Sequence, residues 1–174
     1  MKYTPPAGIT ANDSSALFGL IKGLKDATLG VTDGSSAAPG DIGEVLESTI
    51  PSGSAVSLTT ATGADVTSLA LTAGDWEITG VVDRSLAGTT LTIASCGISL
   101  TADTLPPQAG GSGLSPDAAA YDLKALTTVT GTLNQLVSAE VNAASGTTVH
   151  LVAQDTFSAG TVAAYGTIRA RRVR

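Results

Sequence analysis

Apolar and polar residues alternate with a period of two through most of the chain from Glu44 onward, and this feature constrains the fold most. In the segment "DWEITGVVD", one face of an extended chain would hold Trp76, Ile78, Gly80 and Val82. Successive side chains of a strand point to opposite faces, so the pattern predicts strands with one buried face. The composition agrees, because only 14% of residues are charged and 3% are aromatic, which favours strands and turns over a helix bundle.

We expect about eight strands in these segments, separated by turns that contain glycine. The segments are SAVSLTT, DVTSLALTAGDWEITGVVDRS, TTLTIASCGISLTA, YDLKALTTVTGTLNQLVSAEVNA, GTTVHLVAQDTF and GTVAAYGTIRARRVR. The second segment reads as two strands joined at Ala73, Gly74 and Asp75. Antiparallel strands in this number most simply close into two packed sheets. The sequence therefore predicts an all-β fold, an antiparallel β-sandwich of jelly-roll type over residues 44–174.

Residues 1–43 have a different pattern and are expected to form an N-terminal arm. "YTPPAG" favours an extended entry, because proline fixes φ and restricts the preceding residue. A short helix is predicted next, with one apolar face made of Leu17, Leu20, Ile21 and Leu24. Gly19 and Gly23 weaken this helix by roughly 1 kcal/mol each, so it needs a partner. "VTDGSSAAPGDIG" then reads as a linker.

The apolar stretches, the cysteine content and the net charge indicate where the protein folds and which partners are unfavourable. No secretory signal or membrane-spanning apolar stretch is visible in the sequence. One cysteine, Cys96, cannot form an intrachain disulfide, which fits folding in a reducing cytoplasm. The formal net charge of −6 makes direct nucleic-acid binding unfavourable.

Catalytic chemistry finds little support in the sequence. His150 is the single histidine, and no nucleophile or orienting carboxylate accompanies it in sequence, so an ordinary strand side chain is favoured. Cys96 has no cationic neighbour in sequence and reads as a small core residue. One His and one Cys cannot build the usual zinc site, and no phosphate-binding loop is present. The carboxylates are scattered, although a glycosidase pair could meet in space. We therefore predict no enzyme activity, no catalytic residues, no metal and no cofactor.

Two features leave a binding role open. Trp76 could stack on a sugar, but a tryptophan directly after a turn is more often a core anchor. Residues 103–120 form a long polar connection, and loops of this length are usually functional or flexible. We expect this loop to be exposed, in particular at Pro106, Pro107, Gly110 and Gly111.

Four of the nine basic residues lie within the last six positions: Arg169, Arg171, Arg172 and Arg174. Without them the formal net charge would be −10 instead of −6. One interpretation is a solvated strand end. The other is a subunit interface on the last strand, from residue 162 to 174 and including Tyr165, where arginines meet carboxylates of a neighbour in bidentate geometry.

Several segments resemble a β-rich module of tailed-bacteriophage virion proteins. They are "GDIGEVLESTIPSGSAVSLTTATGADVTSLALTAGDWEITGVVD", "TLPPQAGG" and "VHLVAQDTFSAGTVAAYGTIRARRVR", which together extend from about residue 40 to the last residue. Each motif alone is moderately specific, and their order strengthens the resemblance. The resemblance supplies no catalytic residues.

The resemblance implies a structural protein of the virion, usually a homotrimer, assembled in the host cytoplasm. The short arm and the lack of repeats favour a capsid decoration or cement protein, whose arm would bind the major capsid protein or another virion protein. The alternative is a tail or head fibre module that binds a host-surface receptor or glycan, with Tyr121 as the one aromatic residue adjacent to the long loop. A glycan depolymerase would need a cleft with paired acids.

Overall fold

The computed structural model describes residues 17–19, 21, 35, 37–106, 121–125 and 132–174. The chain divides into two compact units, Met1–Glu44 and Val45–Arg174. In the first unit, residues 17–19 and 21 are helical. Before the boundary a turn is closed by the N–H of Glu44, which donates to the carbonyl of Asp41 at 3.0 Å. The N–H of Gly40 donates to the carboxylate of Glu44 at 2.8 Å.

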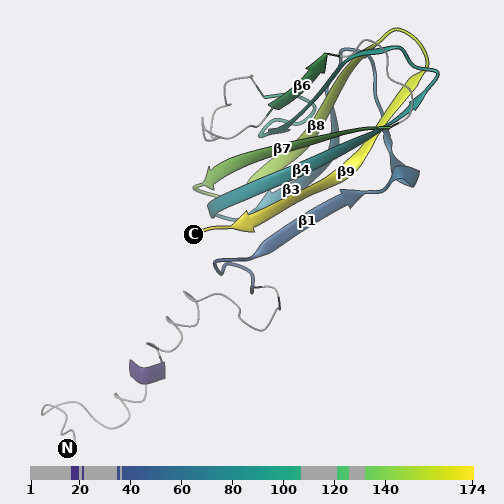
Figure 1. Ribbon diagram of the computed structural model, residues 1–174. Coiled ribbons are helices and arrows are strands. Elements are labelled where there is room, and N and C mark those ends of the chain that lie inside the picture. The colour runs from purple at the N-terminus through teal and green to yellow at the C-terminus, as the bar shows by residue number, and fades with distance from the viewer. Residues whose placement is uncertain (1–16, 20, 22–34, 36, 107–120, 126–131) are drawn as a thin grey trace, which may run out of the picture. The chain divides into compact units, whose positions relative to one another are not determined.

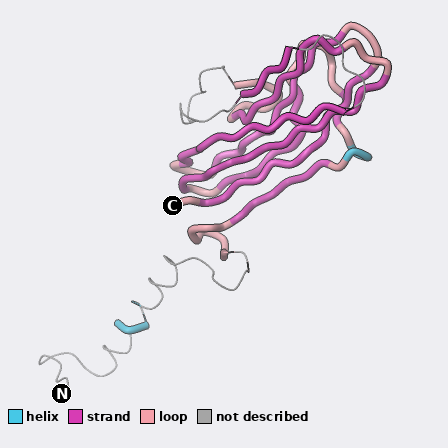
Figure 2. Tube along the Cα trace, viewed as in Figure 1, coloured by secondary structure: helices cyan, strands magenta, loops and turns pink. Residues whose placement is uncertain are grey.

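The described part of the second unit contains nine β-strands and one short 3-10 helix (Figure 2). They are β1 (Val45–Ile50), η1 (Ser52–Ser54), β2 (Val56–Ser57), β3 (Ala64–Leu71), β4 (Gly74–Ala87), β5 (Leu91–Ser99), β6 (Tyr121–Ala125), β7 (Thr132–Ala143), β8 (Thr147–Phe157) and β9 (Thr161–Arg172).

The strands form two antiparallel sheets (Figure 1). One sheet has the order β1-β9-β4-β7, with β2 also paired to β9, and the other has the order β3-β8-β5-β6. If β1 and β2 are counted as one interrupted first strand, the orders become 1-8-3-6 and 2-7-4-5. This is the strand order of a jelly roll. The predicted fold class is therefore confirmed.

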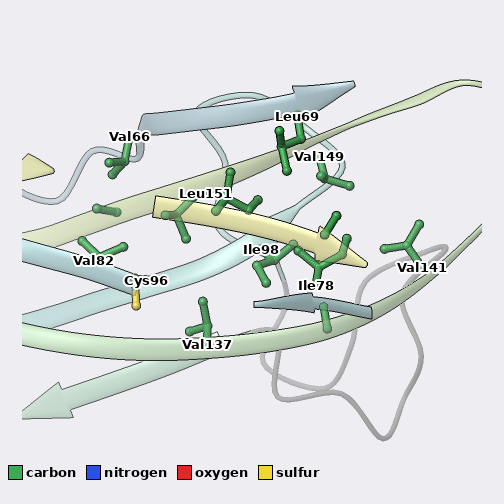
Figure 3. Close-up of a cluster of buried hydrophobic side chains, with 14 of the residues drawn as sticks. Val66, Leu69, Ile78, Val82, Cys96, Ile98, Val137, Val141, Val149 and Leu151 are labelled. Atoms are coloured by element: carbon green, nitrogen blue, oxygen red, sulfur yellow. The ribbon is translucent and has the colours of Figure 1, made fainter. Parts of the chain in front are cut away.

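The predicted alternation is also confirmed. Trp76, Ile78 and Val82 are each 0% exposed and point into the space between the sheets. Apolar side chains of β4, β7 and β9 meet those of β3, β5 and β8 there. Figure 3 labels members of this cluster from β3, β4, β5, β7 and β8. Gly80 shares the inner face, and a Cβ atom on it would lie 2.6 Å from Cδ1 of Leu151 in the opposite sheet. The missing side chain thus lets the two sheets approach closely at this point.

Two local features differ from a simple reading of the sequence. The turn at Ala73 joins β3 and β4, but these strands belong to different sheets and do not form a hairpin. In β5 the pairing with β8 shifts register between Leu91 and Ile93, so Leu91 is buried and Ile93 is only half-buried. Such a bulge breaks strict alternation at one point.

Candidate subunit interface

The last strand, β9, lies within the five-stranded sheet, between β1 and β2 on one side and β4 on the other. Its side chains alternate along the strand: Ile168 and Ala170 are buried, whereas Arg169 and Arg171 are exposed on the outer face. Tyr165 lies on the same outer face and is half-buried. The prediction that Arg169 and Arg171 share one face is thus confirmed.

Carboxylates flank both exposed arginines across the sheet. Arg171 lies opposite Glu77 of β4, and Glu77 lies opposite Glu140 of β7. Arg169 lies opposite Glu47 of β1. Within the described part of the chain, no ion pair joins either arginine to a carboxylate. These five exposed residues, which we call the charged outer face, therefore keep donors and acceptors available for another molecule.

Arg172 points the opposite way and serves its own subunit. Its side chain is buried, and the guanidinium carbon lies 4.4 Å from the centroid of the Trp76 ring. Nη1 donates to the carbonyl of Ala73 at 2.6 Å, and Nη2 donates to Oγ1 of Thr72. A guanidinium over an indole face gains a cation–π interaction. Arg172 lies two residues after the buried Ala170, so its side chain points to the same inner face. Its contacts hold the end of β9 against the turn before β4.

Arg174 lies beyond the end of β9 and pairs with Asp75. The backbone continues the pairing, because the N–H of Asp75 donates to the carbonyl of Arg174 at 2.9 Å, and that of Val173 donates to the carbonyl of Asp75 at 2.9 Å. The hydrogen bond to Asp75 and the charge of that carboxylate raise the pKa of Arg174. The predicted interface set therefore separates into Tyr165, Arg169 and Arg171 on the outer face, and Arg172 and Arg174 in contacts within the chain.

The other residues considered for chemistry occupy structural positions. Trp76 is 0% exposed and its indole N–H donates to the carbonyl of Thr72 at 3.0 Å, so the core-anchor interpretation is confirmed and the sugar platform is wrong. Cys96 is buried in the core. His150 lies on the outer face of the other sheet, with Nδ1 2.5 Å from Oδ2 of Asp65.

Among the described residues, no group of three or more His, Cys, Asp or Glu side chains could hold a metal ion. None of the helical segments in the same part of the chain has the length and hydrophobicity that a membrane span requires.

The start of the long connection packs against β3. The N–H of Asp103 donates to Oδ1 of Asp65 at 2.7 Å, and the N–H of Asp65 donates to Oδ1 of Asp103 at 2.8 Å. Pro106 follows this contact and is buried, so the prediction that it is exposed is wrong. The reciprocal hydrogen bonds draw this part of the connection onto the sheet. Pro107, Gly110 and Gly111 lie outside the described residues.

The arm exposes large apolar side chains. Leu17 is 55% exposed, Ile21 is 53% exposed, and Phe18 between them is 74% exposed. Leu20 and Leu24, which were predicted on the same face as Leu17 and Ile21, lie outside the described residues. Phe18 was missed because it falls off that face, although its size and hydrophobicity were visible in the sequence.

The sequence reading also missed a buried ion pair. Nε of Arg84 lies 2.7 Å from Oδ2 and 2.9 Å from Oδ1 of Asp155, and Nη2 donates to the carbonyl of Ser95 at 2.8 Å. Neither charged side chain is exposed. A signal was present, because Arg84 follows Val82 and Asp155 follows Ala153 at a spacing of two, in phase with the core.

The chain was compared with known proteins by sequence and by structure. No family model matches it, and no curated protein sequence matches it. Its fold is similar to a chain in a structure of the Gx strain of infectious bursal disease virus, with 14% identity, a TM-score of 0.42, and 83% of this chain and 36% of that chain covered. A chain of the VP2 subviral particle of infectious bursal disease virus gives 13% identity, a TM-score of 0.40, and 83% and 37% coverage. The chain thus spans a little over a third of the length of these two chains, and the fold assignment rests on the strand order.

Proposed function

We propose that this chain is a structural protein of a virus particle, a decoration or cement protein of a tailed-phage head that binds the shell through its N-terminal arm. One observation carries the proposal: Leu17, Phe18 and Ile21 are exposed on a helical segment, in a unit of its own. Exposed groups of large apolar side chains mark interaction surfaces. The resemblance of residues 40–174 to a phage virion module supplies the kind of partner.

The sandwich does not need the arm for its core. All described members of the core cluster and the apolar residues packed on it lie between Leu46 and Ala170. The apolar residues of the arm are therefore available for a partner, and burial of each one contributes on the order of 1–3 kcal/mol. If copies are joined in an oligomer, their arms bind the lattice as linked modules, and this multivalency strengthens a weak single anchor.

The mechanism we infer is mass action. A chain that binds neighbouring shell subunits only when they are assembled stabilises the assembled state, because binding removes free copies of that state from the equilibrium. The sandwich would then cover the outside of the shell. Neither role requires a catalytic group.

Self-association belongs to the same proposal. The charged outer face presents arginines and glutamates within one sheet. Arg169 lies opposite Glu47, and Arg171 lies opposite Glu77. Arginines and carboxylates from neighbouring copies can pair across such a face. We expect a cyclic oligomer, and the resemblance favours a homotrimer.

The fibre alternative loses one of its two aromatic candidates, Trp76, while the side chain of Tyr121 lies outside the described residues. Trp76 is buried, so it offers no stacking surface for a glycan. Among the described residues, no cluster of exposed aromatic side chains replaces it. The exposed apolar residues of the arm therefore favour the decoration role.

Binding to phage particles tests the proposal. The full chain is mixed with purified heads of the phage that encodes it, after the native copies have been removed, and bound protein is measured by co-sedimentation. We expect the unaltered chain to bind and the triple variant L17S/F18S/I21S to lose binding at least tenfold. Val173→Ser is the matched control, because Val173 is an exposed apolar residue of the sandwich, 46% exposed. If the triple variant binds like the control, the arm is not the anchor; if the unaltered chain does not bind and is absent from particles by mass spectrometry, the decoration role is wrong.

A further inference from the structure

The two sheets of the sandwich have four edges, formed by β1 with β2, by β7, by β3 and by β6. A sheet edge carries unpaired backbone N–H and C=O groups, which can pair with a strand of another chain. Natural proteins protect such edges with breaks, bulges, prolines, charged side chains or short strands. The four edges of this sandwich differ in how well they are protected.

Three edges carry clear protection. The first is broken after six residues, where Pro51 and η1 separate β1 from β2. The edge of β3 has a register shift between Asp65 and Thr67. The edge strand β6 has five residues in the part of the chain that the structure describes, and it contains Lys124. None of the three is a long, regular template.

The β7 edge is different. This strand has 12 residues, TLNQLVSAEVNA, with one charged residue, Glu140, and no proline or glycine. Its pairing with β4 runs without a shift from Thr132 to Ala143. Within the described residues it pairs on that one side only. Among the described residues, one side chain of another strand reaches the backbone of this edge, at its start, where Nζ of Lys124 donates to the carbonyl of Asn134 at 3.2 Å.

The same strand carries the most exposed large apolar side chain of the described sandwich. Leu136 is 65% exposed on the outer face of β7. A long regular edge beside an exposed leucine is the combination that a monomer avoids and that a strand partner covers. The β7 edge therefore needs an occupant that supplies both a strand and an apolar side chain.

A second copy of β7 meets both needs. Two antiparallel copies of one strand are related by a two-fold axis, and side chains stay on matching faces only if the sum of the paired residue numbers is even. With Leu136 opposite Leu136 of the second copy, the two exposed leucines cover each other. Glu140 then lies opposite Thr132 of the second copy, so the like charges are kept apart. The contact of Lys124 with Asn134 gives way, which costs little because the lysine side chain is 43% exposed.

We propose that two copies of this chain join edge to edge through β7, with Leu136 of one copy opposite Leu136 of the other, so that their five-stranded sheets form one continuous sheet. This contact is isologous, the commonest kind in homo-oligomers. The contact uses a surface other than the arm and the charged outer face, and it does not depend on the proposed decoration role. It requires an even number of chains in solution: a dimer, or a hexamer if a cyclic trimer also forms through another surface.

Disulfide trapping in the full chain tests the contact and its register. Directly opposed residues of antiparallel strands have Cα atoms about 4.5–5.5 Å apart, within the span of a disulfide. Leu136→Cys is oxidised with diamide and analysed by non-reducing electrophoresis, and we expect most of it to become a covalent dimer. The unaltered chain should not link, because Cys96 is buried. Ser138→Cys is the matched control on the same face of the same strand, since its two copies would lie roughly 13 Å apart and should stay unlinked.

The mass of the full chain by sedimentation equilibrium gives an independent readout. We expect an even number of copies for the unaltered chain and half that number for Leu136→Lys, which places two positive charges face to face. A single or odd number of copies in the unaltered chain would overturn the proposal, even if the variants misfold. Equal linking of Leu136→Cys and Ser138→Cys would overturn the register, and an unchanged mass in folded Leu136→Lys would overturn the contact.

Discussion

Arg84 and Asp155 form an ion pair in the interior of the sandwich, with 2.7 Å between Nε and Oδ2 and with neither side chain exposed. The pair links β4 of one sheet to β8 of the other. Two buried charges recover their desolvation cost only while both are present and hydrogen-bonded. The pair therefore fixes how the two sheets face each other at this end of the core.

Removal of one member of this pair should lower the free energy of unfolding far more than replacement of both members by apolar residues. We expect Asp155→Ala to lower the free energy of unfolding by about 3–5 kcal/mol, because it leaves a buried guanidinium without its counter-charge. The double variant R84M/D155L should lose much less than the sum of the two single changes. Urea unfolding followed by circular dichroism measures these values, and exposed Glu77→Ala is the control, expected within about 0.5 kcal/mol of the unaltered chain. Additive single effects would contradict the coupling.

Arg172 should matter for stability although it lies among exposed arginines in the sequence. We expect Arg172→Met to cost about 2–3 kcal/mol, because the change removes the cation–π contact with Trp76 and the hydrogen bonds to the turn before β4. Arg171→Met is the matched control, since Arg171 is the preceding residue on the exposed face of the same strand. Thermal unfolding measures both variants. Equal melting temperatures for the two would mean that the buried contacts contribute nothing.

Cys96 should be unreactive in the native protein. Burial raises the pKa of its thiol from 9.0 to about 11, so little thiolate forms at pH 8, and thiolate is the reactive form. We expect a thiol reagent such as DTNB to modify the chain at pH 8 only after unfolding in urea. Rapid modification of the folded chain would show that the core opens near β5.

The same shift predicts a pH dependence of stability. The folded pKa of Cys96 lies above the unfolded value, so its contribution is fully present below about pH 9 and is lost as the pH rises toward 11. A change of two pKa units corresponds to about 2.7 kcal/mol at most. Urea unfolding at pH 8 and pH 10.5 should therefore show a larger loss for the unaltered chain than for Cys96→Ala, which has no thiol to ionise. Equal losses would contradict the assignment.

Much of this fold could be predicted from the sequence, because the spacing of Trp76, Ile78 and Val82 fixes which face of the strand is buried. The same rule placed Arg169 and Arg171 on one outer face. It also implied that Arg172 points inward, but the clustering of four arginines at the end of the chain hid this. At the end of this strand, the alternation of buried and exposed positions therefore predicts the direction of each arginine better than the clustering of charge does.

Other features could not be predicted, because they depend on contacts between distant segments. A short turn such as that at Ala73 can join strands of one sheet or of two, and local sequence does not distinguish these. The partner of Arg84 lies 71 residues away, and the partner of Asp103 lies 38 residues away. The polar, proline-containing segment that was predicted to be exposed therefore begins against the sheet, and Pro106, three residues after Asp103, is buried.

The charged outer face and the β7 edge are separate surfaces, and variants can show which of them joins the copies. In the background of Leu136→Lys, where the edge contact should be lost, we expect any remaining oligomer to depend on Arg169 and Arg171, because carboxylates of a neighbouring copy need a cation to pair with. Adding R169Q/R171Q should then reduce the mass to that of a single chain, as measured by sedimentation equilibrium at low salt. Lys124→Gln is the control, because it removes an exposed positive charge from β6, which belongs to the other sheet. An oligomer that survives R169Q/R171Q in this background would place the subunit contact on another surface and leave the arginines as a solvated strand face.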